Sequence, residues 1–369
     1  MINTKEFVEY LIENGLDFFT GVPDSLLKEL CACISDVCGK KHNITAANEG
    51  NAIGIACGYY LAARKPCVVY MQNSGIGNAV NPLVSLADEE VYGIPLLMLI
   101  GWRGEPGTSD EPQHKKQGKI TQSLLEALDI KTLILDDDYK EKIKSCVEYM
   151  SEQSKPVALI VRKNTFGKYG YKPSAADYPL TRERALEVIT EKLGADDIVV
   201  STTGKTSREL YEIRERSGFG HSNDFLTVGS MGHASSIALG MSLFSDKKVY
   251  CIDGDGAFIM HMGAAAVNAA SMSDNFRYII INNGAHESVG GQPTVGFDIN
   301  IPEILKDCGF ESVYTALDEK EVVQGMEQLA ENCRSAMVIF TAQGSRPDLG
   351  RPKLTPRENK KLLMEKMMK

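Results

Sequence analysis

The chain has 369 residues, of which 43% are hydrophobic and 24% are charged, and its formal net charge is −9. This composition is typical of a soluble globular protein, and the length indicates two domains that each bury their own core. The acidic balance argues against nucleic acid or an anionic membrane as the main partner. It does not exclude a local basic pocket for a small anion.

The N-terminus and the cysteines indicate a cytoplasmic protein. Residues 1–6 do not resemble the start of a signal peptide, and the longest apolar run, 94–100, is far short of the roughly 20 residues that span a bilayer. The nine cysteines form no CxxC pair, and Cys57, Cys67 and Cys251 lie inside apolar runs, as reduced core thiols do. We therefore expect no membrane segment and a reducing compartment.

Short apolar segments rich in β-branched residues alternate with longer helical patterns along the chain. The segments predicted to be buried parallel strands are, in the first half, 17–22, 43–47, 66–72, 95–102, 131–135 and 156–161. In the second half they are 197–202, 224–230, 248–253, 276–282, 310–315 and 335–342. Because helical patterns separate successive strands, each half is predicted to be a doubly wound α/β domain with a parallel sheet.

A change of composition separates the two halves. Residues 164–182 are rich in glycine, proline, serine and tyrosine and lack an apolar period, which is typical of a linker. We predict one domain over 1–170, a linker over 171–182 and a second domain over 183–369.

Polar residues follow two strands of the second domain. Gly254-Asp255-Gly256 follows the strand 248–253, and Asn282 and Asn283 end the next strand, with Asn283 28 residues after Asp255. Carboxylate, carboxamide and carbonyl oxygens suit magnesium, and a helix N-terminus attracts phosphate oxygens. Alternatively, the two asparagines only cap a turn, but this leaves their spacing from Asp255 unexplained.

This pairing of GDG with NN resembles the signature of thiamine diphosphate-dependent 2-oxoacid decarboxylases. The resemblance implies a pyrimidine-binding domain, a diphosphate-binding domain and no middle domain. It also implies a magnesium ion held by Asp255, Asn283 and the carbonyl of Ala285. Further residues implied to contact thiamine diphosphate are Gly204, Gly229, Met231, Gly254, Gly256 and Ala257.

Glu49 is the carboxylate that the resemblance requires in the first domain. It follows the strand 43–47 and begins a helix rich in glycine and alanine. The resemblance implies that Glu49 hydrogen-bonds N1′ of the aminopyrimidine and is catalytic; without it, Glu49 could simply complement the helix dipole. In the family the two domain types face each other across a subunit interface, which implies a homodimer or a dimer-based homo-oligomer.

The segments "FFTGVPDSLL", "GWRGEPGTSDEPQHKKQGK" and "GSRPDLGRP" narrow the resemblance to a short branch that acts on phosphonopyruvate. The implied reaction is non-oxidative decarboxylation to phosphonoacetaldehyde, a step of phosphonate biosynthesis such as that of 2-aminoethylphosphonate, with Asp24 and His114 as further catalytic residues. A phosphonate needs cationic or amide donors. The candidates that the sequence leaves open for binding this anionic 2-oxoacid are Arg103, Lys115, Lys119, His286, Arg346 and Arg351.

Other interpretations of the function stay open at this point. Sulfopyruvate decarboxylases share the same motifs, and an acetolactate-type ligase or another 2-oxoacid decarboxylase would use the same cofactor. A 2-oxoacid oxidoreductase subunit is disfavoured because no cysteine cluster has iron–sulfur spacing. A protein that only binds nucleotides would have no need of Glu49. Gly204-Lys205-Thr206 is not a P-loop, because Val199 stands where the pattern needs glycine.

Overall fold

The computed structural model describes residues 1–170 and 177–368, which divide into two compact α/β units. Unit 1 contains the described residues 1–170 together with 289–292, and unit 2 contains 177–288 together with 293–368. Residues 171–176 of the predicted linker lie outside the described residues. The predicted domain boundaries stay predictions.

Unit 1 is built on a six-stranded parallel sheet in the order β2-β1-β3-β4-β6-β5. Its strands are β1 (Phe19–Gly21), β2 (Asn43–Thr45), β3 (Cys67–Gln72), β4 (Leu96–Gly101), β5 (Lys131–Ile134) and β6 (Val157–Val161). Each lies within one of the predicted segments. All six run in one direction, so their carboxyl ends meet at one edge of the sheet, where ligands bind in open α/β folds.

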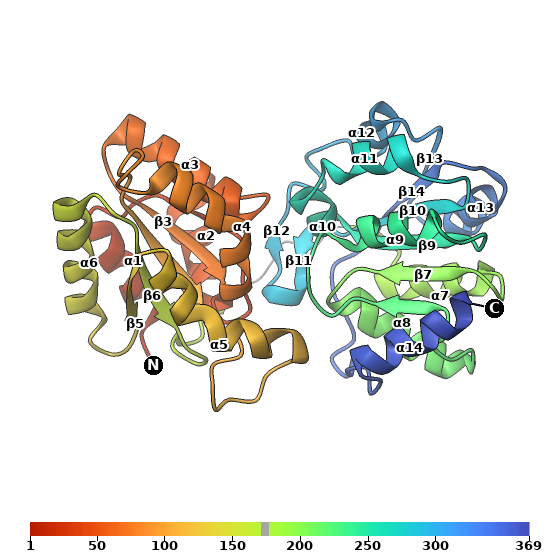
Figure 1. The fold of residues 1–369 in the computed structure, drawn as a ribbon, viewed down its shortest axis with the longest axis horizontal. Helices are drawn as coiled ribbons and strands as arrows, with labels where there is room; N and C mark the ends of the chain where they lie inside the picture. The colour runs from red at the N-terminus through yellow and green to blue at the C-terminus, as the bar shows by residue number, and fades with distance from the viewer. Residues whose placement is uncertain (171–176, 369) are drawn as a thin grey trace. The chain divides into compact units, whose positions relative to one another are not determined.

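Helices cover both faces of this sheet (Figure 1). The bounds are α1 (Thr4–Glu13), α2 (Lys28–His42), α3 (Glu49–Ala63), η1 (Asn73–Gly75), α4 (Ile76–Pro82), η2 (Leu83–Ala87), α5 (Pro112–Ala127) and α6 (Tyr139–Gln153). Alternate strand residues enter separate cores: Val68 and Tyr70 pack with α1, α2 and α6, whereas Val69 and Met71 pack with α3 and α4. The alternation is why the β3 sequence is apolar from Cys67 to Met71.

Unit 2 repeats this design with the strand order β13-β14-β10-β9-β7-β8. The parallel strands are β7 (Ile198–Ser201), β8 (Asp224–Leu226), β9 (Val249–Gly254), β10 (Phe276–Asn282), β13 (Ser312–Ala316) and β14 (Ser335–Phe340). β8 is shorter than its predicted segment, 224–230, because the chain turns after it and both Ser230 and Gly232 adopt positive φ.

Two layers of helices enclose the second sheet. The bounds are α7 (Arg182–Lys192), α8 (Lys205–Ser217), α9 (Ala234–Ser242), α10 (Asp255–Met260), α11 (Ala264–Ser271), α12 (Ile301–Cys308), α13 (Glu319–Glu331) and α14 (Pro356–Met367). One core joins the sheet to α7, α8 and α13, and the other joins it to α9, α10, α11, α12 and α14. Short elements follow β10: β11 (Ala285–His286), η3 (Glu287–Val289) and β12 (Gln292–Pro293).

The sequence marks several helix starts with side-chain caps. Asn3, Asn48 and Thr181 each accept a backbone N–H at the start of their helix, and Thr355 forms a capping box with Glu358. These bonds satisfy donors that a helix leaves open at its first turn. The cap at Asn48 fixes where α3 begins and therefore where Glu49 lies.

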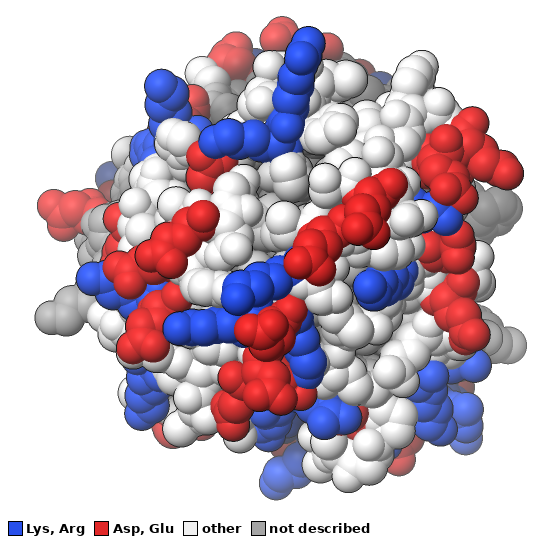
Figure 2. Space-filling model, turned by 90° about the vertical axis from the view of Figure 1, so that its left-hand side faces the viewer, with Lys and Arg blue, Asp and Glu red and all other residues white. Residues whose placement is uncertain are grey.

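The surface mixes both signs of charge. Figure 2 shows Lys and Arg side chains interspersed with Asp and Glu side chains over one face. Exposed pairs such as Lys5–Glu9 each contribute about 1 kcal/mol or less. Within the described residues, no helix is long and apolar enough to cross a membrane.

Candidate active site

A short turn after β3 brings together the polar groups of unit 1. This turn spans Gln72 and η1 (Asn73–Gly75). Gln72 donates to Asp24, Asn73 donates to the carbonyl of Arg103, and Gly75 lies against Glu49. Three of the predicted catalytic or substrate residues therefore contact one turn at the carboxyl edge of the sheet.

Glu49 is held at the first turn of α3, where it is 5% exposed. The Asn78 side chain in α4 donates from Nδ2 to Oε2 of Glu49 at 2.7 Å. A Cβ on Gly75 would lie 2.3 Å from Oε1 and 2.5 Å from Cγ of Glu49, so a larger residue at this position would displace the carboxylate. These contacts fix one carboxylate oxygen and leave Oε1 as the acceptor that could serve a ligand.

Asp24 is fully buried at the end of β1, in the loop that leads to α2. Its Oδ1 accepts from Gln72 at 2.6 Å and its Oδ2 accepts from the N–H of Leu26 at 3.0 Å. A Cβ on Gly101, the last residue of β4, would lie 2.2 Å from Oδ2. Burial raises the pKa of Asp24 despite these hydrogen bonds.

Arg103 and His114 converge on a third residue, Asp110. Arg103 donates to both carboxylate oxygens of Asp110, at 2.8 Å from Nε and 2.5 Å from Nη2. His114, which is buried in α5, places Nδ1 2.8 Å from Oδ1 of Asp110. Burial acts to raise the pKa of Asp110, but the hydrogen bonds from Arg103 and His114 outweigh it and lower that pKa. The guanidinium charge of Arg103 is thus already compensated inside unit 1.

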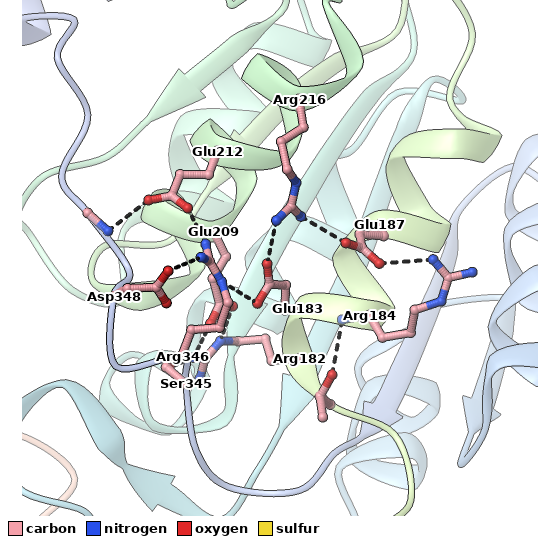
Figure 3. Close-up of polar contacts among 12 residues, drawn as sticks. Arg182, Glu183, Arg184, Glu187, Glu209, Glu212, Arg216, Ser345, Arg346 and Asp348 are labelled. Carbon is pink, nitrogen blue, oxygen red and sulfur yellow. Dashed lines mark hydrogen bonds and ion pairs between the residues drawn. The ribbon is translucent and has the colours of Figure 1, made fainter.

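The other candidate cations lie in different surroundings. Lys115 and Lys119 are exposed on α5. Arg346 is ion-paired with Glu183, Glu212 and Asp348 (Figure 3). Within unit 1 the structure therefore brings Asp24 and Arg103 together around the turn after β3 and leaves Lys115 and Lys119 exposed on α5.

In unit 2 the ends of β9 and β10 form a polar corner. Ile281 pairs with Gly254, which places Asp255 and Asn283 just beyond neighbouring strand ends, and Asn282 is the last residue of β10. Asp255 is 2% exposed and accepts from the Thr294 hydroxyl and from the N–H of Asn283. Burial raises its pKa to about 6. Within residues 1–170 and 177–368 no cationic side chain pairs with it.

The carboxamide of Asn283 has a fixed orientation. Its Oδ1 accepts from the N–H of Ala285 at 3.1 Å, and its Nδ2 donates to Oε2 of Glu287 at 2.9 Å. Asn282 supports the same turn, since it accepts from the N–H of Gly284 at 3.1 Å and donates to the carbonyl of Gly296 at 2.6 Å. The two amides therefore have different partners: Asn282 joins the turn to a later segment, whereas Asn283 contacts Ala285 and Glu287.

Several predicted cofactor residues surround this corner. A Cβ on Gly256 would lie 3.1 Å from His286 and 3.4 Å from the methyl group of Met231. Gly204 adopts positive φ at the start of α8, and a Cβ there would lie 2.6 Å from the hydroxyl of Ser288. The remaining predicted residues lie at the same strand ends: Gly229 after β8, Gly254 at the end of β9, Ala257 in α10 and Ala285 in β11.

His286 lies against this surface as a neutral side chain. Burial lowers its pKa to about 4, so the ring is uncharged near neutral pH. It can accept or donate a hydrogen bond to a ligand but does not supply a positive charge.

The corner fits a magnesium ion bound to a diphosphate. Its oxygens come from the Asp255 carboxylate, Oδ1 of Asn283 and the Ala285 carbonyl, and these are hard ligands. Asp255 is buried without a counter-ion, and a divalent cation would supply the missing charge.

Sequence reasoning missed the residues that orient the candidate groups. Gly75 and Asn78 stand in "NSGIGN", where glycine and polar residues directly after a strand were an available signal. Asp110, Glu287 and Gly296 carried no such signal, because their partners come from other elements.

The family models match both units. Residues 3–125 match the N-terminal thiamine pyrophosphate binding domain of thiamine pyrophosphate enzymes, and residues 200–342 match the C-terminal one. The chain belongs to the thiamine pyrophosphate enzyme family. It contains the two cofactor-binding domains of the family without a middle domain, as predicted.

Curated relatives cover almost the whole of this thiamine pyrophosphate enzyme. The phosphonopyruvate decarboxylase of Streptomyces viridochromogenes is 32% identical over 97% of this chain and 93% of its own length. That of Streptomyces hygroscopicus is 31% identical over 97% and 92%. The sulfopyruvate decarboxylase of Methanosarcina acetivorans is 28% identical over 89% and 88%. The resemblance inferred from the motifs is thereby confirmed at the level of the family and its decarboxylase members.

Proposed function

We propose that this enzyme decarboxylates 3-phosphonopyruvate to phosphonoacetaldehyde and carbon dioxide, with thiamine diphosphate and magnesium as cofactors. The observation that carries the proposal is the 32% identity to a phosphonopyruvate decarboxylase over nearly the full length of both chains. Sulfopyruvate is the second candidate substrate, because a sulfopyruvate decarboxylase is similar at 28% identity.

The chain has candidate residues to bind each end of the cofactor. When bound, thiamine diphosphate supplies a carbon nucleophile and an electron sink for decarboxylation. Glu49, with Asn78 on Oε2, has Oε1 for a hydrogen bond to N1′ of the aminopyrimidine. Asp255, Asn283 and the Ala285 carbonyl would hold the magnesium ion, and Gly254, Gly256 and Ala257 would line the diphosphate.

Asp24 and His114 are the candidate groups for the substrate end. Burial raises the pKa of Asp24. Asp110 binds Nδ1 of His114, which leaves Nε2 as the atom that can hold a proton for the product carbon. Arg103 already pairs with Asp110, so the phosphonate, which carries up to two negative charges, needs an additional donor such as Lys115. His286, being neutral, would contribute only a hydrogen bond.

The remaining parts of the proposal concern assembly. The pyrimidine-binding domain would extend over 1–170 and the diphosphate-binding domain over 183–369, joined by a linker over 171–182. The enzyme would act as a homodimer or a dimer-based homo-oligomer in the cytoplasm, with Glu49 of one subunit and Asp255 of another on one cofactor. An active species with the mass of a monomer in light scattering would contradict this assembly.

The decisive experiment compares substrates. Protein loaded with thiamine diphosphate and magnesium is supplied with phosphonopyruvate, sulfopyruvate or pyruvate, and carbon dioxide release is measured against a Glu49→Gln background. We expect release to be fastest from phosphonopyruvate. Comparable rates on all three would reject phosphonopyruvate as the preferred substrate but would agree with decarboxylation. No release from any of them would reject the decarboxylase proposal.

A further inference from the structure

Glu287 is a nearly buried carboxylate that the proposed chemistry does not use. It begins η3, four residues after Asn283, and its side chain is 10% exposed. Its Oε2 accepts from Nδ2 of Asn283 at 2.9 Å. One carboxylate therefore directly contacts a predicted metal ligand.

Three elements of unit 2 hold this carboxylate in place. Arg182 of α7 donates to Oε2 at 2.5 Å, Lys205 of α8 donates to Oε1 at 2.9 Å, and Ser345 after β14 donates to Oε1 at 2.8 Å. Arg182 is itself fixed by two further bonds to Glu209, at 2.7 and 2.8 Å (Figure 3). Two cations and two carboxylates thus form a cluster without net charge.

The cluster selects one of the two orientations of the Asn283 amide. In the observed orientation Nδ2 faces the carboxylate of Glu287 and Oδ1 faces the N–H of Ala285. Rotation by a half turn would place Oδ1 against the carboxylate and Nδ2 against the N–H, so both contacts would become repulsive. Ion pairs to Arg182 and Lys205 hold the Glu287 carboxylate on the side that faces Nδ2 of Asn283.

We propose that Glu287 is a positioning residue, which holds Asn283 with Oδ1 turned to the metal corner and is itself held by Arg182, Lys205 and Ser345. This inference rests on the proposed magnesium site. Partners behind a metal ligand commonly orient it in this way, and their loss weakens metal binding about 10- to 100-fold.

A purely structural role makes a different prediction. If Glu287 only neutralises Arg182, its loss would lower the thermal midpoint of the ligand-free protein and leave magnesium binding by the folded protein unchanged. If it positions Asn283, the effect on magnesium binding depends on Asn283 being present. A double-mutant cycle separates the two roles.

The experiment measures binding of thiamine diphosphate by calorimetry while magnesium is titrated, in wild type, Glu287→Ala, Glu287→Gln, Asn283→Ala and the double variant E287A/N283A. We expect Glu287→Ala to need about 10- to 100-fold more magnesium for half-maximal cofactor binding. Glu287→Gln keeps an acceptor for Nδ2, so its magnesium affinity should fall less, and it serves as the test if Glu287→Ala does not fold. The magnesium affinity of the double variant should be no lower than that of Asn283→Ala alone.

Glu212→Gln is the matched control, because it removes a carboxylate from the adjacent Arg346 ion pair without touching Asn283. It should need as much magnesium as wild type. A wild-type magnesium dependence in Glu287→Ala would overturn the inference, and so would losses of magnesium affinity that add up in the double variant. Neither result would contradict the proposed metal site. Failure of wild type to bind thiamine diphosphate with magnesium would instead reject the proposed function.

Discussion

Gly75 offers a direct test of how closely Glu49 must be positioned. Replacing Gly75 with alanine adds one methyl group, which would lie 2.3 Å from Oε1 and 2.5 Å from Cδ and Cγ of Glu49. Carbon atoms in contact lie about 3.5–4.0 Å apart. The carboxylate must therefore shift by roughly 1 Å, away from its bond to Asn78.

A shift of this size should affect activity more than stability. Overpacking of this kind costs about 1–3 kcal/mol of unfolding free energy, and the flexible Glu49 side chain can relieve part of it. A displacement of about 1 Å in a catalytic group lowers turnover about 100-fold. We therefore expect Gly75→Ala to fold with a small loss of thermal midpoint and to lose about two orders of magnitude in kcat.

The assay is carbon dioxide release at saturating cofactor, with the thermal midpoint measured on the same samples. Gly167→Ala is the control, because its added Cβ would lie 3.5 Å from the nearest atom, the carbonyl of Ile2, which is an ordinary contact. Wild-type turnover in a folded Gly75→Ala variant would refute the reasoning that Glu49 must occupy this position.

Three further predictions concern the carboxylates. Glu49→Gln should bind thiamine diphosphate but have almost no turnover; turnover like that of wild type would exclude the catalytic role. Asp255→Ala should lose magnesium-dependent cofactor binding in a calorimetric titration, and intact binding would exclude it as a metal ligand. The hydrogen bonds from Arg103 and His114 outweigh the effect of burial and lower the pKa of Asp110 below its ordinary 3.8. These bonds therefore stabilise the fold fully above about pH 4. This stabilisation is lost as the pH falls toward the lowered pKa. Asp110→Asn should therefore unfold more easily than wild type at about pH 6, with a gap that narrows below about pH 4 in denaturant titrations; a constant gap would contradict the assignment.

The fold was largely predictable because its strands are buried on both faces. Sequences such as "CVVYMQ" and "FRYIIIN" are mostly apolar and too short for helices, and both form strands within the predicted limits. The corner at Asp255 and Asn283 was predictable for a related reason: parallel strand ends meet at one edge, so spacing along the chain indicates proximity.

The orienting residues were not predictable in this way. Arg182 and Glu209 stand in helices whose many charges suggest exposed faces, yet they are 5% and 1% exposed because they pair with each other. Asp110 belongs to a polar loop, "EPGTSDEP", that resembles a solvated turn until Arg103 and His114 reach it. Such pairs join elements that are distant in sequence, and local pattern carries no information about them.

The hydrogen bond from the N–H of Gly284 to Asn282 has a consequence for the chemical lifetime of the protein. Asn283-Gly284 is a dipeptide that deamidates readily in flexible chains, because the glycine nitrogen attacks the preceding carboxamide carbon. Here that nitrogen is engaged by the side chain of Asn282, and the Asn283 amide is held by Ala285 and Glu287. Folding therefore protects this asparagine from conversion to aspartate, whereas an unfolded chain would deamidate at this dipeptide.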